Sequence, residues 1–274
     1  MLLQRLLTGI ALAALTFGIA LAAPAWAWAA YAGAGTLVGA HEWARLTRCG
    51  ERQVLAYVLL IGALLALVYA AKRVPASNWI SGLDQSLLLI ALMFWLAVVP
   101  LWLYLEWRPK NQAILLLAGV IVLLPTWIAT LVLQRSGKAF LFAIGVVIVA
   151  DTAAYFCGRV LGRRKLAPRI SPGKTWEGVI GAFAAVLLLV LIVQWSLDSQ
   201  ADAHSWLATI LLGGVLTTLS IEGDLFESWI KRQAGAKDSG SILPGHGGVL
   251  DRLDGLTASL PFAALYLSHA TGSA

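Results

Sequence analysis

The feature that most constrains this chain is a series of apolar runs about as long as a lipid bilayer is thick. A helix that crosses the hydrocarbon core needs about 20 mostly apolar residues, and such runs recur along the 274 residues. A mean hydropathy of +0.81 and only 12% charged residues agree with that pattern. The sequence therefore predicts an all-α polytopic membrane protein.

Nine ranges are predicted as transmembrane helices. They are Leu6–Ala23, Ala25–Ala40, Val54–Ala71, Gln85–Tyr104, Ala113–Leu133, Phe140–Phe156, Glu177–Gln194, His204–Ile221 and Asp254–Ala270. The residues AAPAWA around Pro24 are also compatible with a signal-peptide cleavage site, although the apolar core is long and more spans follow. Pro261 interrupts the last range, which a membrane helix tolerates where neighbours satisfy the freed carbonyl. We divide the chain into N-terminal transmembrane helices, residues 1–110, and a C-terminal region, residues 111–274.

The distribution of Lys and Arg predicts the orientation, because cytoplasmic loops are enriched in both. With a cytoplasmic N-terminus, 16 of the 20 Lys and Arg residues fall in the inner segments 1–5, 41–53, 105–112, 157–176 and 222–253. The C-terminus is then periplasmic. This bias accounts for the net charge of +6 without a nucleic-acid partner. An interfacial belt is the expected role of the tryptophans near span ends, Trp26, Trp28, Trp95, Trp102 and Trp107.

The first polar segment covers residues 151–178. Its SPGKTWEG motif places Ser171, Lys174 and Thr175 directly before an expected helix. Backbone N–H groups at a helix start, with a nearby Lys, attract phosphate. An ordinary basic loop with a capping threonine explains these residues equally well. The segment is not a P-loop, because the glycine five residues upstream of GKT is missing.

Asp151 lies near the inner end of an apolar range. An ionisable group in that position is costly and is usually functional or paired. Arg159 is the candidate structural partner.

The second polar segment begins after Ile221. If the helix continues, Asp224, Glu227, Ser228 and Lys231 fall along one stripe at i, i+3, i+4 and i+7. A solvated helix end explains the stripe as well, and for Glu227 it is the better explanation.

The stretch AKDSGSILPGHGGVLDRLDG, residues 236–255, follows. Its glycines, Gly247 and Gly248 among them, permit left-handed backbone and an anion-binding nest. Asp251 and Asp254 are three apart, so a helix beginning there presents both carboxylates to one side. Helix capping needs fewer charges than are gathered here: Asp224, Asp251, Asp254, His246, Lys231, Arg232, Lys237 and Arg252. Magnesium prefers carboxylates together with substrate phosphates, so the set indicates metal-assisted phosphoryl chemistry.

The run from Ser228 to Asp254, SWIKRQAGAKDSGSILPGHGGVLDRLD, resembles the signature of the phosphatidate cytidylyltransferase (CDP-diacylglycerol synthase) family. DTAAYFCGR and ISPGKTWEG also look like segments of that family, and the likeness is weakest before about residue 100. The resemblance implies that CTP and phosphatidic acid react to give CDP-diacylglycerol and pyrophosphate, with Mg²⁺ and a K⁺ ion beside it. It further implies a homodimer among the lipids of the bacterial inner membrane, with a catalytic C-terminal region whose site faces the cytoplasm.

The resemblance also implies roles for individual residues. Asp224 and Asp251 match metal-binding acids, and Asp254 closes the same motif as a third expected ligand. The residues expected to be catalytic are Asp224, Lys237, Asp238, His246, Asp251, Arg252 and Asp254. Those expected to bind substrate are Asp151, Arg159, Ser171, Lys174, Thr175, Ser228, Lys231, Arg232, Gly247 and Gly248.

Other functions remain as alternatives. A CTP-dependent kinase of a lipid alcohol would use a comparable nucleotide site but would need a base for the alcohol. A transporter would be expected to show internal repeats and discontinuous helices near the membrane midplane, whereas the polar residues here cluster at the cytoplasmic edge. A CDP-alcohol phosphotransferase motif begins at Asp254-Gly255, but Leu256-Thr257-Ala258 does not continue it.

Overall fold

Helices make up nearly all of the structure, a computed structural model that describes residues 2–72, 78–197, 203–242 and 247–270. They are α1 (Leu2–Ala22), α2 (Ala25–Leu46), α3 (Glu51–Ala71), α4 (Asn78–Met93), the π-helical η1 (Phe94–Val98), α5 (Val99–Tyr104), α6 (Gln112–Gln134), α7 (Gly137–Val160), α8 (Trp176–Leu197), α9 (Ala203–Ala234) and α10 (Leu250–Ala270). Two short strands, β1 (Lys165–Ala167) and β2 (Ser171–Thr175), pair antiparallel. The all-α expectation is therefore confirmed except for this hairpin, which lies where a loop was expected.

The expected spans coincide with helices over the described residues. Each expected range lies within one helix, where α4, η1 and α5 are counted as one continuous helical segment. The exception is Ala23, which follows the end of α1. By length and composition, six described helices could cross a bilayer, namely Glu51–Ala71, Gly82–Tyr104, Gln112–Gln134, Gly137–Val160, Trp176–Ser196 and His204–Ala234. Nine spans remain a prediction, since α1, α2 and α10 do not meet that measure over the described residues.

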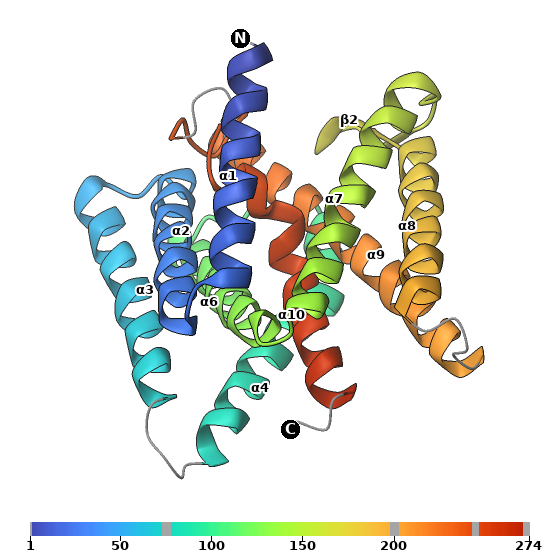
Figure 1. Ribbon diagram of the computed structural model, residues 1–274. Coiled ribbons are helices and arrows are strands. Elements are labelled where there is room, and N and C mark those ends of the chain that lie inside the picture. Colours follow the sequence, from blue (N-terminus) through green and yellow to red (C-terminus); the bar gives the residue numbers. More distant parts are fainter. Residues whose placement is uncertain (1, 73–77, 198–202, 243–246, 271–274) are drawn as a thin grey trace.

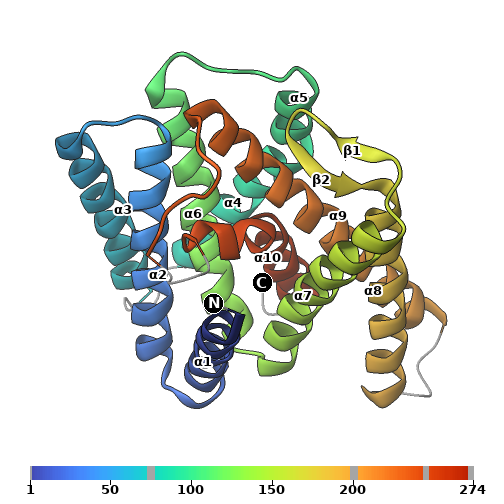
Figure 2. The same ribbon diagram turned by 90° about the horizontal axis from the view of Figure 1, so that it is seen from above.

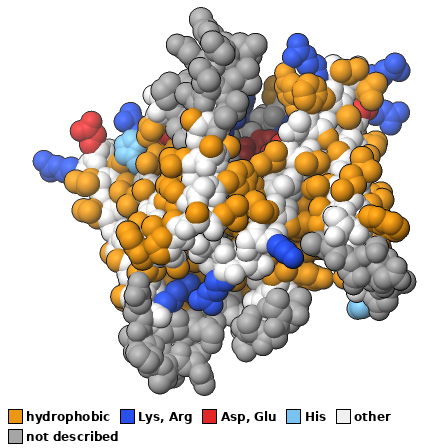
Figure 3. All heavy atoms as spheres, in the orientation of Figure 1, with side chains coloured by type: hydrophobic (Ala, Val, Ile, Leu, Met, Phe, Trp, Pro, Cys, Tyr) orange, Lys and Arg blue, Asp and Glu red, His pale blue; other side chains and the backbone are white. Residues whose placement is uncertain are grey.

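Helix α10 lies near the middle of the helical array (Figure 2) and packs against α2, α4, α6, α7 and α9. Helix α1 begins at the end of the molecule that carries β2, whereas α10 finishes at the opposite end (Figure 1). Apolar side chains cover the flanks, and acidic side chains are visible in a hollow near the β2 end (Figure 3). The structure thus has lipid-compatible sides and a polar end.

An aromatic cluster anchors α9 against the α4–η1–α5 rod. Phe226 on α9 makes edge contacts with the rings of Phe94, Trp95 and Trp102, with centroids 5.7, 5.6 and 5.4 Å away. Such ring pairs add to the stabilisation that burial provides. Trp95 and Trp102 are buried, as is Trp28, so the interfacial prediction is wrong for these three.

Glycines let α7 and α8 approach closely beside the hairpin. A Cβ on Gly178 would meet the carbonyl oxygen of Ala154 at 2.8 Å, and one on Gly181 would overlap the sulfur of Cys157. Cys157 and Cys49 are free thiols. The close approach brings β2 against α7 at the polar end.

Candidate active site

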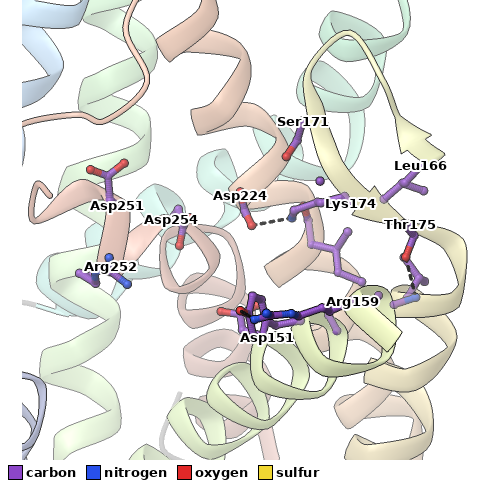
Figure 4. Close-up of a pocket in the computed structure, with 17 residues that line it drawn as sticks. Asp151, Arg159, Leu166, Ser171, Lys174, Thr175, Asp224, Asp251, Arg252 and Asp254 are labelled. Atoms are coloured by element: carbon purple, nitrogen blue, oxygen red, sulfur yellow. Dashed lines mark hydrogen bonds and ion pairs between the residues drawn. The ribbon is translucent and has the colours of Figure 1, made fainter. Parts of the chain in front are cut away.

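A cavity of about 570 Å³ opens at the β2 end and is lined by α7, the hairpin, α8, α9 and α10. Ser171 and Thr175 contribute hydroxyl groups to its lining. The charged residues that line it (Figure 4) are Asp151, Arg159, Lys174, Asp224, Asp251, Arg252 and Asp254. Segments that are distant in the sequence therefore contribute acids and bases to one site.

Lys174 lies among the acids at the centre of this cavity. Its ammonium group is 2.6 Å from Oδ2 of Asp224 and donates to the carbonyl of Ile221 at 3.4 Å. Asp151 accepts a hydrogen bond from Ser220 at 3.3 Å. Asp254 lies on the Asp224 side of Asp251 in the close-up view (Figure 4). One lysine thus offsets the charge of a group of carboxylates.

Helix α9 positions Asp224 because it continues past Ile221 to Ala234. Phe226, Trp229 and Ile230 form a buried face of this continuation, while Asp224 lines the cavity. The predicted polar stripe is confirmed, but Glu227 is buried, so a solvated helix end was the wrong explanation for it. Lys231 contacts Glu227 at 3.2 Å, which partners that carboxylate inside the protein.

The hairpin positions Lys174 and Thr175. Thr175 is buried and its Oγ1 accepts from the N–H of Gly178 at 3.1 Å, which caps the start of α8. Lys174 precedes it on β2 and reaches the cavity, as does Ser171. Both interpretations of SPGKT are therefore compatible with the structure: the threonine caps, and the lysine faces a site.

Arg159 lies at the α7 wall of the cavity. It donates to the hydroxyl of Tyr155 at 2.8 Å, and Tyr155 also lines the cavity. Ser220, and not the expected partner Arg159, donates a hydrogen bond to Asp151. The expected structural pairing of Asp151 with Arg159 is thus replaced by two separate interactions, and both side chains face the cavity.

Asp251 stands in the first turn of α10 and is held on both oxygens. Lys231 donates to Oδ1 at 2.6 Å, while Oδ2 accepts from Ser239 N, Ser239 Oγ and Gly248 N at 2.9, 3.0 and 2.9 Å. Burial raises the pKa of this carboxyl, but the hydrogen bonds from Lys231, Gly248 and Ser239 outweigh it and hold the pKa below its ordinary value. Asp251 is therefore ionised and rigidly oriented.

Known proteins match this chain along its whole length. The sequence profile of the Cytidylyltransferase family matches residues 3–270. A Pseudomonas aeruginosa protein named "Phosphatidate cytidylyltransferase" is 39% identical over 287 residues that cover 100% of both chains. One of the same name from Haemophilus influenzae is 34% identical over 284 residues, covering 97% of this chain and 98% of the relative. A Brucella suis protein, also so named, is 55% identical over 128 residues, 47% of this chain and 44% of its own.

This chain belongs to the cytidylyltransferase family. The residues expected from the sequence to form the site can now be compared with the lining of the cavity. The described lining of the cavity includes Asp151, Arg159, Ser171, Lys174, Thr175, Asp224, Asp251, Arg252 and Asp254. These nine come together as a site, whereas the roles assigned to each of them stay predictions.

Other expected residues lie behind or beside the cavity of this family member. Ser228 donates to Asp224 at 3.3 Å, Lys231 holds Asp251, and Arg232 donates to the carbonyls of Ile170 and Ala236 at 3.4 and 3.3 Å. Lys237 and Asp238 are exposed and do not contribute to the described lining. His246 lies outside the described residues.

Gly247 and Gly248 lie beside Asp251, and their expected contact with substrate phosphate stays a prediction. Gly247 adopts a φ of +84°, in the left-handed region that favours glycine. The N–H of Gly248 does bind an anion, and that anion is the carboxylate of Asp251. The nest predicted for this loop thus orients a side chain of the family member itself.

The donor set suits magnesium, which binds hard oxygens and keeps positions for substrate phosphates. Asp224 and Asp254 offer carboxylates at the cavity. Among the described residues, Oδ1 of Asp251 accepts from Lys231 alone and has capacity left, while the amides of Ser239 and Gly248 donate to Oδ2 and the Ser239 hydroxyl lies beside it. Over the described part of the chain, no three acidic, His or Cys side chains form a ready-made metal cage, so substrate oxygens would have to complete the coordination.

Sequence reasoning did not select four residues that the structure connects to this site. Ser220 bonds Asp151, Tyr155 bonds Arg159, and Ser239 bonds Asp251. Glu42 on α2 accepts from Ser239 as well. A glutamate two residues after an apolar range was a usable signal, but Glu42 fell among the charges of the expected inner segment 41–53.

Proposed function

We propose that this protein transfers the cytidylyl group of CTP to phosphatidic acid, giving CDP-diacylglycerol and pyrophosphate at the cytoplasmic face of the membrane. The observation that carries the proposal is the cavity at the polar end of the helices, where Asp224 and Lys174 form a pair beside Asp151 and Asp254. The names and full-length coverage of the relatives support the choice of substrates.

The position of the cavity suits one lipid and one soluble substrate. A lipid phosphate would lie at the headgroup level, and CTP would enter from the cytoplasm. Arg159, Lys174 and Arg252 line the cavity and are suited to binding anionic phosphates. The predicted positive-inside orientation supports a cytoplasmic site in the inner membrane of a bacterium, and the family resemblance supports a homodimer.

In the proposed reaction, a phosphate oxygen of phosphatidic acid attacks the α-phosphorus of CTP. A new P–O bond forms, the bond between the α- and β-phosphates breaks, and pyrophosphate leaves with the electron pair. The attacking oxygen is already anionic, so the protein has to supply positioning and charge neutralisation rather than a strong base. Lys174 is placed to neutralise phosphate charge, and release from Asp224 would free its ammonium group for that purpose.

We include Mg²⁺ in the proposal, with Asp224, Asp254 and Oδ1 of Asp251 as its protein ligands and K⁺ as a second ion. When bound, magnesium would offset phosphate charge and help to orient the triphosphate. Asp151 lies at the same cavity as a further carboxylate. Chelation should abolish turnover, and added Mg²⁺ should restore it.

The deciding experiment uses the purified protein in detergent with Mg²⁺ and CTP labelled at either the α- or the γ-phosphate, and offers phosphatidic acid or, in parallel, a lipid alcohol as the acceptor. Label from the α-phosphate in the extracted lipid, with labelled pyrophosphate released from γ-labelled CTP, is the expected result. Transfer of γ-label to a lipid alcohol would instead identify a CTP-dependent kinase. Failure of both labels to enter lipid would reject both reactions, and a transporter would then be tested by CTP or lipid uptake into vesicles.

A further inference from the structure

Glu42 is a buried carboxylate that belongs to none of the elements lining the cavity. It lies near the end of α2 and is 1% exposed. Burying a carboxylate is costly unless hydrogen bonds replace its water. The contacts that compensate the desolvation of the Glu42 carboxylate therefore indicate what the residue does beside the cavity.

Two backbone amides donate to the Glu42 carboxylate, and the Ser239 hydroxyl, whose single proton is shared between Glu42 and Asp251, lies beside it. The N–H of Val249 donates to Oε1 at 3.0 Å, and the N–H of Leu250 donates to Oε2 at 2.9 Å. These amides stand at the start of α10, where backbone N–H groups have no helical partner and favour an anion. The hydroxyl of Ser239 lies 2.9 Å from Oε2. Glu42 therefore joins α2 both to the start of α10 and to the segment before it.

Ser239 extends this connection to Asp251. Its hydroxyl lies 3.0 Å from Oδ2 of Asp251, and its backbone N–H donates to the same oxygen at 2.9 Å. Because these contacts are made to Oδ2, they leave Oδ1 directed to Lys231. The orientation of Asp251 at the cavity thus depends on a serine that is itself held by Glu42.

Close packing shows how tightly this arrangement is built. A Cβ on Gly240 would lie 2.5 Å from Oε1 of Glu42, and one on Gly248 would overlap the Ser239 hydroxyl. One turn earlier on α2, a Cβ on Gly39 would lie 3.2 Å from a methyl group of Leu250. Little space remains for Glu42 or Ser239 to adopt another position.

We propose that Glu42 is a positioning residue, which fixes the first turn of α10 and, through Ser239, orients the carboxylate of Asp251. Its effect on turnover rests on the proposed cytidylyl transfer, whereas its hold on the loop and helix does not. Since Glu42 lies outside the cavity lining, its loss should lower kcat and leave the KM values for CTP and phosphatidic acid nearly unchanged.

The test compares Glu42→Gln and Glu42→Asp with Glu51→Gln, a control at an exposed glutamate in the first turn of α3. The amide of Glu42→Gln turns a donor towards the N–H groups, so we expect kcat to fall by about 10- to 100-fold with KM changed by less than about three-fold. Glu42→Asp keeps the carboxylate and should recover part of the loss. Glu51→Gln should behave as wild type.

Hydrogen exchange gives a readout that is independent of activity. In Glu42→Gln, the amides of residues 247–253 should exchange at least about ten-fold faster, while the aromatic core of α9 keeps its protection. Unchanged exchange there, or kcat within about three-fold of wild type, overturns the proposal. If wild type makes no CDP-diacylglycerol, the proposed function fails, and the exchange result still decides whether Glu42 holds this segment.

A second variant decides the matter if Glu42→Gln fails to fold. Ser239→Ala keeps Glu42 on the first amides of α10 but removes the hydroxyl between the two carboxylates. We expect kcat to fall by about ten-fold or more without a matching change in KM. A kcat within about three-fold of wild type would show that Asp251 does not depend on this connection.

Discussion

Replacing Lys174 with methionine tests the electrostatic design of the cavity. The substitution removes the ammonium group that lies 2.6 Å from Asp224 and retains most of the length of the side chain. The Lys174 and Asp224 side chains are 22% and 32% exposed, so water screens the pair only partly. Loss of one positioned charge-stabilising group costs on the order of 100- to 1000-fold in rate. We expect the lower value here, about 100-fold in kcat/KM, or about 2.7 kcal/mol.

The assay is transfer of α-labelled CTP into extractable lipid, measured across Mg²⁺ concentrations. Because Lys174 occupies an oxygen of Asp224, the variant should need no more Mg²⁺ than wild type for half-maximal rate. Lys165→Met is the matched control, since this exposed lysine lies on β1 of the same hairpin and outside the described cavity lining. The reasoning is refuted if Lys174→Met stays within about three-fold of wild type, or if Lys165→Met loses as much activity.

Three further predictions follow from named contacts. Asp224→Asn and Asp251→Asn should each lower lipid labelling by more than about 100-fold with normal membrane insertion, and near-normal turnover would remove that residue from the proposed metal site. Thr175→Ala should lose about 1 kcal/mol of stability with the cap of α8, seen as a lower melting temperature in detergent that Thr175→Ser does not share. Gly248→Ala should lower the melting temperature, because its Cβ would overlap the side chains of Ser239 and Glu42. Gly35→Ala should not, because a Cβ there meets nothing within 4 Å. Equal melting temperatures for the two variants would contradict this reasoning.

Much of the helical framework could be predicted because its cause is local. Length and apolarity of each run set the helices, and the polar stripe of α9 follows from helical spacing. The three-residue spacing of Asp251 and Asp254 likewise indicated that both would face one side, and both line the cavity. Boundaries were less predictable, since α7 extends from Gly137 to Val160, beyond the apolar residues on which its range was based.

The pattern of neighbouring residues in the sequence did not predict the β1–β2 hairpin or the burial of Glu227. Six basic residues in the segment 157–176 indicated a loop, but β1 and β2 pair across it through backbone hydrogen bonds, which side-chain charge does not report. Glu227 looked solvated in sequence, yet Lys231 partners it inside the protein. Lys231 lies one turn from Glu227 on α9, so their pairing is local, but the burial of Glu227 depends on the helices that pack around it.

The sequence by itself determined the membrane-helical class, the family and most of the residues now found around the cavity. Only the tertiary structure brought Asp151 on α7 to the same cavity as Asp224 and Asp254, and only it placed Glu42 behind Asp251. The physical reason is that hydrophobic length and helical period act within a segment and can be read along the chain. The partners of Glu42 come from distant segments of the chain, so they become apparent only when the helices are assembled.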